Sequence, residues 1–314
     1  MEIRTRFAPS PTGYMHLGNV WIAFLNWWWT RQHRGKIVLR IEDIDQLRCH
    51  EKYISAIQED LTWLGLDWDE GPEHIYPYGA LRQSQRYDIY KTIQKNWERE
   101  DLLYPCFCSR ARIHKISSAP HLGEKWIGYD GHCRSLSDEV KRTIKKIPSW
   151  RVKIDEEKIS FDDMFCGTQI KVLKAKYDDF VVFRADGAVA YQLAAAADDG
   201  TMGITHVFRG NDLLPSTFYQ IYLLKKLKYS VPLYGHLPLL VDKTGVRLSK
   251  RQHGITVKEL REAGVSAEQI IGQFLFWLGA LKKPVPLSAE TALTDISFSS
   301  CTHVCNPVVR IDTI

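Results

Sequence analysis

Near its start the chain reads Arg6-Phe7-Ala8-Pro9-Ser10-Pro11-Thr12-Gly13 and continues into His16-Leu17-Gly18-Asn19. Residues 2–8 alternate weakly between apolar and polar, which predicts a first strand, and the prolines and glycine that follow mark a turn. A helix that begins after such a turn binds phosphate well, because its backbone N–H groups and positive dipole end face the anion. In this position His16 can donate a hydrogen bond to a phosphoryl group as charge develops. The stretch therefore predicts a nucleotide site.

The next hundred residues continue an alternation of helix and strand. Residues 20–31 are apolar and aromatic, which predicts a buried helix, and we interpret the run Trp27-Trp28-Trp29 as core packing rather than a base-stacking platform. A second strand is expected over 36–41, and helices near 50–64 and 83–100. Strand, helix, strand, helix is the pattern of an α/β fold with a Rossmann-like, doubly wound parallel sheet.

The alternation breaks after residue 100, and we interpret residues 101–180 as an insertion in the nucleotide-binding fold. The sheet is expected to resume with strands at 180–184 and 190–193, followed by a strand over 204–210 and a helix near 215–227. Two short helices are expected over 257–282, and the Ser/Thr-rich tail has no clear periodicity. The expected units are 1–100 and 181–253 for the two halves of the Rossmann domain, 101–180 for the insertion, 254–285 for a short helical part, and 286–314 for a tail of uncertain structure.

Bulk properties narrow the class of protein. The chain has 314 residues and a net charge of +5, which mildly favours a polyanionic partner. It contains no apolar run near the ~20 residues of a membrane span, and its N-terminus enters a strand without a leader, so we expect a cytoplasmic protein with no membrane partner. Seven cysteines, an odd number, argue against a disulfide framework.

A second motif, Arg247-Leu248-Ser249-Lys250-Arg251, predicts a mobile basic loop. In this order and spacing the two motifs resemble the two signatures of class I aminoacyl-tRNA synthetases. The resemblance narrows to the glutamyl and glutaminyl branch and covers roughly residues 3–282, though it thins inside the insertion. The segments that carry it are Arg6–Asn19, Arg40–Asp45, Leu64–Gly71 and Phe208–Leu213.

The resemblance implies that glutamate is activated with ATP, with Mg²⁺ on the phosphates. It implies His16 and Lys250 as catalytic residues, and His16, Gly18, Asn19, Arg247, Ser249 and Lys250 as ATP-binding residues. It implies a glutamate pocket built from Arg6, Phe7, Ala8, Pro9, Ser10, Glu42, Tyr191 and Arg209. The family usually begins the second signature with lysine, and here Arg247 keeps the charge but not the same hydrogen-bonding geometry.

The chemistry of these residues suits glutamate. An arginine fork, from Arg6 or Arg209, matches a side-chain carboxylate, and Glu42 at a strand end suits the substrate ammonium. Tyr191 can hydrogen-bond to either polar group.

Cys106-Phe107-Cys108 and Cys133 have metal-like spacing, and a structural zinc ion takes four ligands. The residues themselves leave the fourth ligand open, with His132 or His121 the usual chemistry. The pattern Cys-x-Cys…Tyr-x-x-x-Cys resembles a truncated group of glutamyl paralogues, which implies Tyr129 as the fourth ligand of one structural Zn²⁺. We interpret Cys301-x-His303-x-Cys305, which lacks a partner pair, as a chance occurrence.

The acceptor follows from the same resemblance. Because the sequence ends at Ile314, we expect it to lack the helical anticodon-binding domain that follows the second signature in the full-length enzymes. The truncated paralogues attach glutamate to the queuosine base in the anticodon loop of tRNA(Asp). We expect the basic residues of the insertion, Lys141, Arg142, Lys145, Lys146, Arg151 and Lys153, to contact that stem-loop. The alternatives are a short glutamyl-tRNA synthetase that charges tRNA(Glu), a non-synthetase adenylyltransferase, and a non-catalytic RNA-binding paralogue. A monomer is expected.

Overall fold

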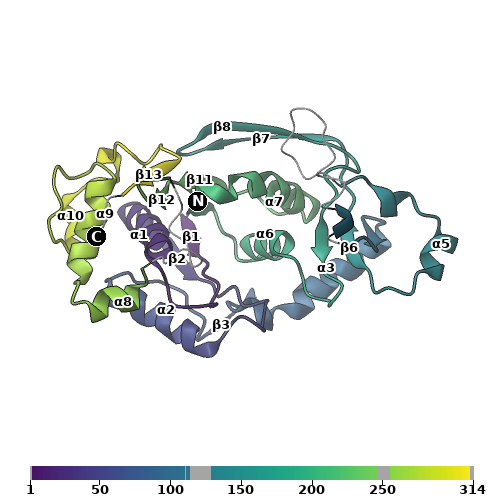
Figure 1. The fold of residues 1–314 in the computed structure, drawn as a ribbon, viewed down its shortest axis with the longest axis horizontal. Coiled ribbons are helices and arrows are strands. Elements are labelled where there is room, and N and C mark those ends of the chain that lie inside the picture. The colour runs from purple at the N-terminus through teal and green to yellow at the C-terminus, as the bar shows by residue number, and fades with distance from the viewer. Residues whose placement is uncertain (1, 110, 114–128, 246–254, 312–314) are drawn as a thin grey trace.

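The computed structural model describes residues 2–109, 111–113, 129–245 and 255–311. Figure 1 shows an elongated molecule with the C-terminal helices at one end, the first parallel strands near the middle and α5 (Asp138–Thr143) at the other end. Within the described residues, every helix is too short or too polar to cross a membrane.

The first half of the catalytic unit begins with two parallel strands. β1 (Arg4–Phe7) pairs in parallel with β2 (Lys36–Leu39), and α1 (Leu17–Gln32) makes the crossover between them. The predicted first strand, buried helix and second strand are therefore confirmed. The remaining elements of this half are α2 (Glu51–Trp63), β3 (Ile75–Tyr76), β4 (Gly79–Ala80), the 3-10 turn η1 (Gln83–Gln85) and α3 (Tyr87–Arg99).

The second half repeats the parallel arrangement. β10 (His206–Gly210) pairs in parallel with β11 (Leu233–Leu237) through α7 (Leu214–Lys226), which carries Pro at its first turn. β10 lies beside β1, since the Thr205 backbone N donates to the Arg4 carbonyl at 2.9 Å. The short helix η3 (Asn211–Leu213) precedes α7, and β12 (Leu239–Val241) follows β11.

One predicted strand is wrong. Residues 190–193 were expected to form a strand, but Tyr191 begins α6 (Tyr191–Thr201). The segment Ala194–Ala197 is fully buried on all sides of this helix, and an all-round apolar run has no period that separates a buried helix from a buried strand.

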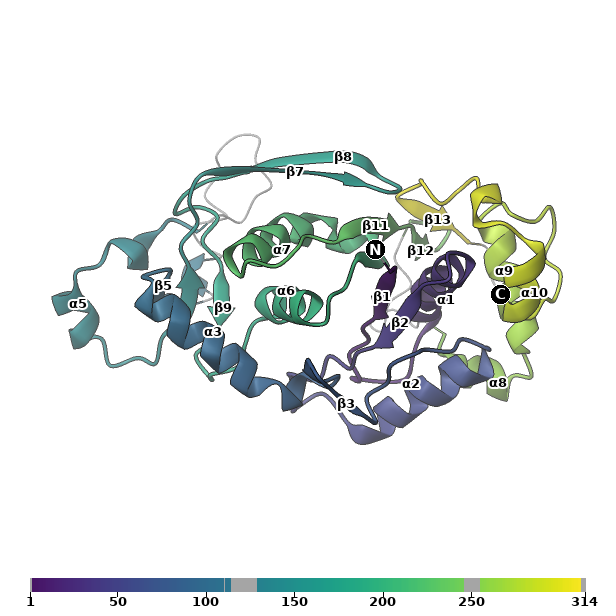
Figure 2. The ribbon, with the colours of Figure 1, turned by 180° about the vertical axis from the view of Figure 1, so that it is seen from behind.

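The insertion forms its own antiparallel sheet and a long hairpin. β5 (Leu103–Cys106), β6 (Ser149–Val152) and β9 (Val181–Phe183) form a three-stranded sheet with η2 (His132–Ser135) beside it. Strand β9 therefore belongs with the insertion and not with the parallel sheet, contrary to the expected resumption at residue 180. The hairpin β7 (Glu157–Asp163) and β8 (Gly167–Leu173) returns along α7, as Figures 1 and 2 both show, and β7 pairs with β11 at Tyr234.

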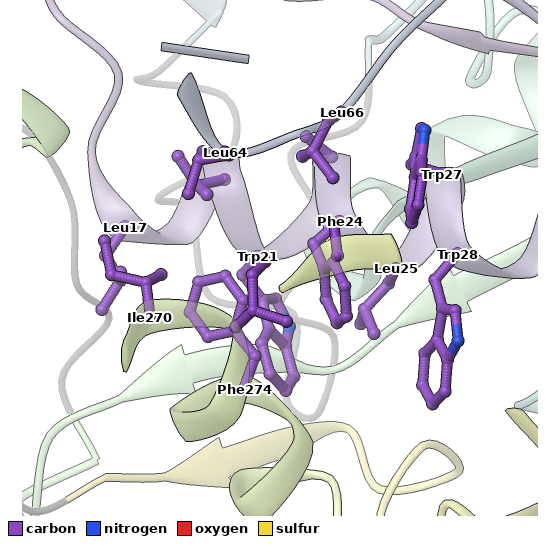
Figure 3. Packing of buried hydrophobic residues seen from close by; sticks show 14 of the residues in the cluster. Leu17, Trp21, Phe24, Leu25, Trp27, Trp28, Leu64, Leu66, Ile270 and Phe274 are labelled. Carbon is purple, nitrogen blue, oxygen red and sulfur yellow. The ribbon is translucent and has the colours of Figure 1, made fainter. Parts of the chain in front are cut away.

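The larger hydrophobic core surrounds α1. Figure 3 shows its side chains, including Trp21, Phe24 and Trp28, between Leu64 and Leu66 on one side and the C-terminal helix α9 (Ala267–Trp277) on the other. The rings of Phe24 and Trp28 are stacked with centroids 5.6 Å apart. All three consecutive tryptophans are buried, which agrees with their interpretation as core packing.

The C-terminal part completes that core. Helices α8 (Val257–Glu262) and α9 both begin with capping boxes, Thr256 with Glu259 and Ser266 with Gln269, which satisfy the first free N–H groups of each helix. The tail, whose structure the sequence left open, contains α10 (Ala289–Asp295), η4 (Phe298–Ser300) and β13 (Val308–Arg310). β13 adds to β12 in parallel, and Phe298 packs on Trp28, so the tail is part of the fold.

Candidate active site

The turn after β1 forms one wall of a cavity of about 380 Å³. The chain crosses this wall from Arg6 to His16, the N-cap residue of α1, so the start of that helix faces the cavity. The opposite walls come from the carboxyl ends of β2 and β10 and the start of α6. Ligands of open α/β sheets bind at this edge, where the carboxyl ends of parallel strands meet.

The cavity brings together every predicted ATP-binding and glutamate-binding residue that the structure describes. They are Arg6, Phe7, Ala8, Pro9, Ser10, His16, Gly18, Asn19, Glu42, Tyr191 and Arg209. The remaining three, Arg247, Ser249 and Lys250, lie outside the described residues.

The segments that flank this second motif lie at the same cavity. On one side, Leu239 and Leu240 line it. On the other, the Leu17 backbone N donates to the Ile255 carbonyl at 3.1 Å, and the Val257 N donates to the Met15 carbonyl at 2.9 Å. The residues that follow the second motif are therefore hydrogen-bonded to the residues at the end of the first motif.

Arg6 is held in place by a buried carboxylate. Its Nε donates to Asp199 Oδ1 at 3.1 Å, and one terminal nitrogen donates to the Phe208 carbonyl at 3.2 Å. Arg40 donates to the same Asp199 oxygen at 2.7 Å. Burial acts to raise the pKa of Asp199, but the charges of Arg6 and Arg40 outweigh it and hold the pKa below its ordinary value. Asp199 is therefore an anion that fixes two arginines.

Arg209 is fixed by three other contacts. Its terminal nitrogens donate to Gln220 Oε1 at 2.6 Å and to Thr217 Oγ1 at 2.7 Å, both on α7. Its Nε donates to His236 Nε2 at 3.1 Å. The side chain is 4% exposed and still lines the cavity. Two arginines thus lie in fixed positions at one site, as recognition of a carboxylate requires.

Glu42 is the acidic group beside these arginines. Its Oε1 accepts from Arg40 at 3.1 Å, and its side chain is 11% exposed. Burial raises the pKa of Glu42, although Arg40 and Arg6 oppose the shift. A bound cation in the cavity would replace part of the lost solvation, so this carboxylate suits an ammonium group.

The three predicted cysteines meet beside β5. The sulfur atoms of Cys106, Cys108 and Cys133 lie within 4.8 Å of one another, and the Tyr129 hydroxyl lies 3.8 Å from Cys106 Sγ. Cys106 and Cys133 are buried. Three convergent sulfurs and a phenol oxygen form a donor set that fits one tetrahedral zinc ion.

Of the two histidines considered for the fourth ligand, His132 has an exposed side chain outside the cluster, and His121 lies outside the described residues. The geometry therefore favours Tyr129. The ligand atoms of Cys301, His303 and Cys305 do not converge as a group among the described residues, and His303 Nδ1 lies 3.0 Å from the Trp277 carbonyl.

One of the predicted nucleic-acid contacts is wrong. Arg151 is 6% exposed, donates to Cys106 Sγ at 3.2 Å and lies over the Tyr129 ring, so it belongs to the cysteine cluster. Lys153 pairs with Asp101 at 2.6 Å. Arg142, Lys145 and Lys146 are exposed in and after α5.

The residues that fix the arginines were not found from the sequence. Asp199 lies in α6 directly after Asp198, and both follow four alanines. Two adjacent acidic residues after an apolar run were the one sequence signal that could have pointed to Asp199. His236 and Asp163 are buried on β11 and β7. Each is a single polar residue in an otherwise ordinary strand, so no sequence motif marks it as part of the site.

The profile of the family described as tRNA synthetases class I (E and Q), catalytic domain, matches residues 2–284. A protein of Symbiobacterium thermophilum named Glutamyl-Q tRNA(Asp) synthetase is 44% identical over 91% of this chain and 89% of its own length. One of the same name from Nitratidesulfovibrio vulgaris is 42% identical over 90% and 89%.

Longer proteins and solved structures also match. Glutamate–tRNA ligase 2 of Nitrosococcus oceani is 41% identical over 85% of this chain but only 57% of its own length. The crystal structure of a glutamate tRNA ligase from Elizabethkingia meningosepticum in complex with its amino acid superposes with a TM-score of 0.82 at 27% identity, over 99% of this chain and 67% of that one.

Proposed function

The chain belongs to the class I tRNA synthetases of the glutamyl and glutaminyl type, and on that premise we propose which reaction it performs. It activates L-glutamate with ATP as glutamyl-adenylate and transfers the glutamyl group to the queuosine base in the anticodon loop of tRNA(Asp). The observation that carries the activation step is one cavity that holds two fixed arginines, Glu42 and Tyr191 next to the helix start at His16. The two relatives named Glutamyl-Q tRNA(Asp) synthetase, which align over nearly their whole length, support the acceptor.

In the first step, an oxygen of the glutamate α-carboxylate attacks the α-phosphorus of ATP. The new O–P bond forms as the bond to pyrophosphate breaks. His16 and the start of α1 stabilise the charge that develops on the phosphoryl oxygens. Gly18 and Asn19 line the nucleotide side of the cavity, and Arg247, Ser249 and Lys250 bind the phosphates from the second motif. Mg²⁺ that accompanies ATP neutralises phosphate charge.

Glutamate is held by charge at both ends. Arg6 and Arg209 bind the side-chain carboxylate, Glu42 binds the ammonium, and Tyr191 donates a hydrogen bond. The wall Phe7–Ser10 contacts the substrate through its backbone. Because both arginines are fixed by buried partners, they measure the length of the substrate, and a substrate one methylene shorter fits less well by about 1–3 kcal/mol.

In the second step, a hydroxyl of queuosine attacks the acyl carbon of the adenylate, and AMP leaves. The exposed residues Arg142, Lys145 and Lys146, at the end of the molecule that carries α5, contact tRNA phosphates (Figure 1). Cys106, Cys108, Cys133 and Tyr129 bind one structural zinc ion that stabilises the insertion. We place the reaction in the cytoplasm, where charged tRNA is made.

The activation step is tested by glutamate-dependent exchange of pyrophosphate into ATP, measured without any tRNA. We expect exchange with L-glutamate and much less with L-aspartate or L-glutamine. Exchange that appears only after tRNA(Glu) is added would favour the short glutamyl-tRNA synthetase instead. Absence of exchange under both conditions would exclude both enzymes and leave a non-catalytic RNA-binding paralogue.

A further inference from the structure

A chain of buried polar groups lies behind Arg209. His236, on β11, lies between Arg209 and Asp163, which comes from the inserted hairpin β7–β8. His236 Nε2 is 3.1 Å from Arg209 Nε, and His236 Nδ1 is 2.6 Å from Asp163 Oδ2. The side chains of His236 and Asp163 have no solvent-accessible surface. None of the site residues expected from the sequence includes this pair.

The contacts allow one state of the histidine. The Thr217 hydroxyl oxygen also lies 3.0 Å from His236 Nε2 and could either donate or accept there. Arginine is always protonated and its Nε–H can only donate, so the contact with Arg209 decides the state, and His236 Nε2 accepts with its lone pair. The proton of the neutral ring therefore lies on Nδ1, from which it is donated to Asp163. Burial lowers the pKa of His236, and its bond to Asp163 offsets only part of that shift, in agreement with a neutral ring.

Asp163 is itself held rigidly. Its Oδ1 accepts from the backbone N of Phe165 at 3.0 Å and of Cys166 at 2.9 Å, in the turn of the hairpin. The His236 backbone N also donates to the same carboxylate at 3.2 Å. The carboxylate is therefore anchored by the backbone on both sides and fixes the orientation of the imidazole ring.

The imidazole ring in turn fixes the Nε–H side of the Arg209 guanidinium. Thr217 and Gln220 accept from the two terminal nitrogens, and the Tyr234 ring lies 5.4 Å from the guanidinium carbon. Each terminal nitrogen carries two N–H groups, so one on each is left over after these contacts. Arg209 lines the cavity, and its remaining N–H groups can donate to a carboxylate bound there.

We propose that His236 and Asp163 are positioning residues for the substrate's side-chain carboxylate: Asp163 fixes the Nδ1–H tautomer of His236, and His236 orients the guanidinium of Arg209. The inference rests on the proposed binding of glutamate in this cavity. It gives the inserted hairpin a part in amino-acid recognition, since Asp163 is the hairpin's contact with this network.

Two substitutions of one residue separate positioning from packing. The amide oxygen of Gln reaches the place of the imidazole Nε2, so His236→Gln keeps an acceptor for Arg209. The shorter Asn reaches only the place of Nδ1, so His236→Asn keeps the contact with Asp163 and loses the one with Arg209. KM for glutamate, KM for ATP and kcat are measured by pyrophosphate exchange at pH 7.5, together with the melting temperature.

We expect His236→Asn to raise KM for glutamate about tenfold or more, the effect of losing one hydrogen bond to a charged group, while KM for ATP stays within about twofold. His236→Gln should recover most of that loss. Equal effects of the two variants, or an equal rise in both KM values, would overturn the proposal. A wild-type protein that shows no glutamate-dependent exchange would instead refute the proposed function.

A measurement on the wild-type protein covers the case in which the variants do not fold. In ¹⁵N-histidine-labelled protein, the NMR shifts of the His236 ring should be those of a neutral ring with the proton on Nδ1. A proton on Nε2, or a doubly protonated ring at pH 7.5, would contradict the geometry argument. Asp163→Asn offers a further check, because its amide can donate to Nδ1, favour the Nε2–H tautomer and produce the same selective rise in KM for glutamate.

Discussion

Replacing Glu42 by Gln removes one negative charge from the cavity and keeps the shape of the side chain. In the wild type, Glu42 accepts from Arg40 at 3.1 Å, and Arg40 is also paired with Asp199 at 2.7 Å. The Gln oxygen can still accept from Arg40, and Arg40 keeps its ion pair with Asp199. The substitution therefore leaves the buried arginine with a counter-charge and removes the one proposed for the substrate ammonium.

The expected loss in binding follows from that charge. A hydrogen bond to a charged group contributes about 1.5–3 kcal/mol, and each 1.4 kcal/mol is a factor of ten. We therefore expect Glu42→Gln to lower kcat/KM for glutamate by about 10–100-fold. KM for ATP should change little, since Glu42 lies on the amino-acid side of the cavity.

Although Glu42→Gln should weaken glutamate binding, it should not lower the stability of the fold. Burial raises the folded-state pKa of Glu42 above its ordinary value of 4.5. A carboxyl group with a raised folded pKa costs stability as pH rises from the unfolded value through the folded one, because the folded state retains the proton. Gln has no such cost, so the variant should be at least as stable as the wild type at pH 7. Because Glu42 takes up a proton at a pH above 4.5, kcat/KM of the wild type should begin to fall above that pH as the solution is acidified. The variant has no titrating group at this position, so this fall in kcat/KM should be absent.

The assay is pyrophosphate exchange over a range of glutamate concentrations from pH 5 to 8, with thermal unfolding monitored in parallel. Unchanged kcat/KM for glutamate in the variant would refute the role of Glu42 in binding the ammonium. A melting temperature several degrees lower would show that Glu42 is a structural ion pair instead.

Three further substitutions test other parts of the structure. Asp60 is buried, and burial raises its pKa from 3.8 to about 6 despite Arg261 at 3.5 Å. The wild type therefore loses stability as the pH rises from about 4 to about 6, because the folded state holds its proton more tightly than the unfolded state. Asp60→Asn should raise the free energy of unfolding, measured by urea denaturation, by about 2–3 kcal/mol at pH 7 and leave it unchanged below pH 4. Elemental analysis should find one zinc ion per chain in the wild type; Cys133→Ser removes one of the converging sulfurs and should abolish that zinc and lower the melting temperature, whereas a full zinc content in the variant would contradict the assigned ligands. Trp28→Ala empties a fully buried site against Phe298 and should cost about 3–5 kcal/mol in urea denaturation, and a cost below 1 kcal/mol would show that the tail does not pack there.

Local signals predicted the parts of the fold that they control. The Gly/Pro turn after β1 and the aromatic helix α1 were expected because special backbone residues and a long apolar stretch are read directly from the chain. Residues 190–193 were misassigned to a strand, since the buried run Ala194–Ala197 that continues their helix has no polar face to show a period. β9 was assigned to the wrong sheet because the sequence of a short apolar strand does not indicate which other strand it pairs with.

The site divides in the same way. Most of the predicted residues that line the cavity belong to the contiguous first motif, and Glu42, Tyr191 and Arg209 were expected from the family resemblance. The residues that hold them were not, since Asp163, Asp199 and His236 are distant in sequence and meet only in the folded chain. Arg151 was assigned to nucleic acid from its charge alone, and its burial against Cys106 could be seen only in three dimensions.

The most direct test of the central claim is transfer of labelled glutamate to defined tRNAs. The protein is incubated with ATP, labelled L-glutamate and one of three acceptors: tRNA(Asp) that contains queuosine, the same tRNA without queuosine, or tRNA(Glu). After nuclease digestion, the label should appear only with the first acceptor and only in the fragment that carries the anticodon loop. Label at the 3′ end of tRNA(Glu) would contradict the account and identify a short glutamyl-tRNA synthetase.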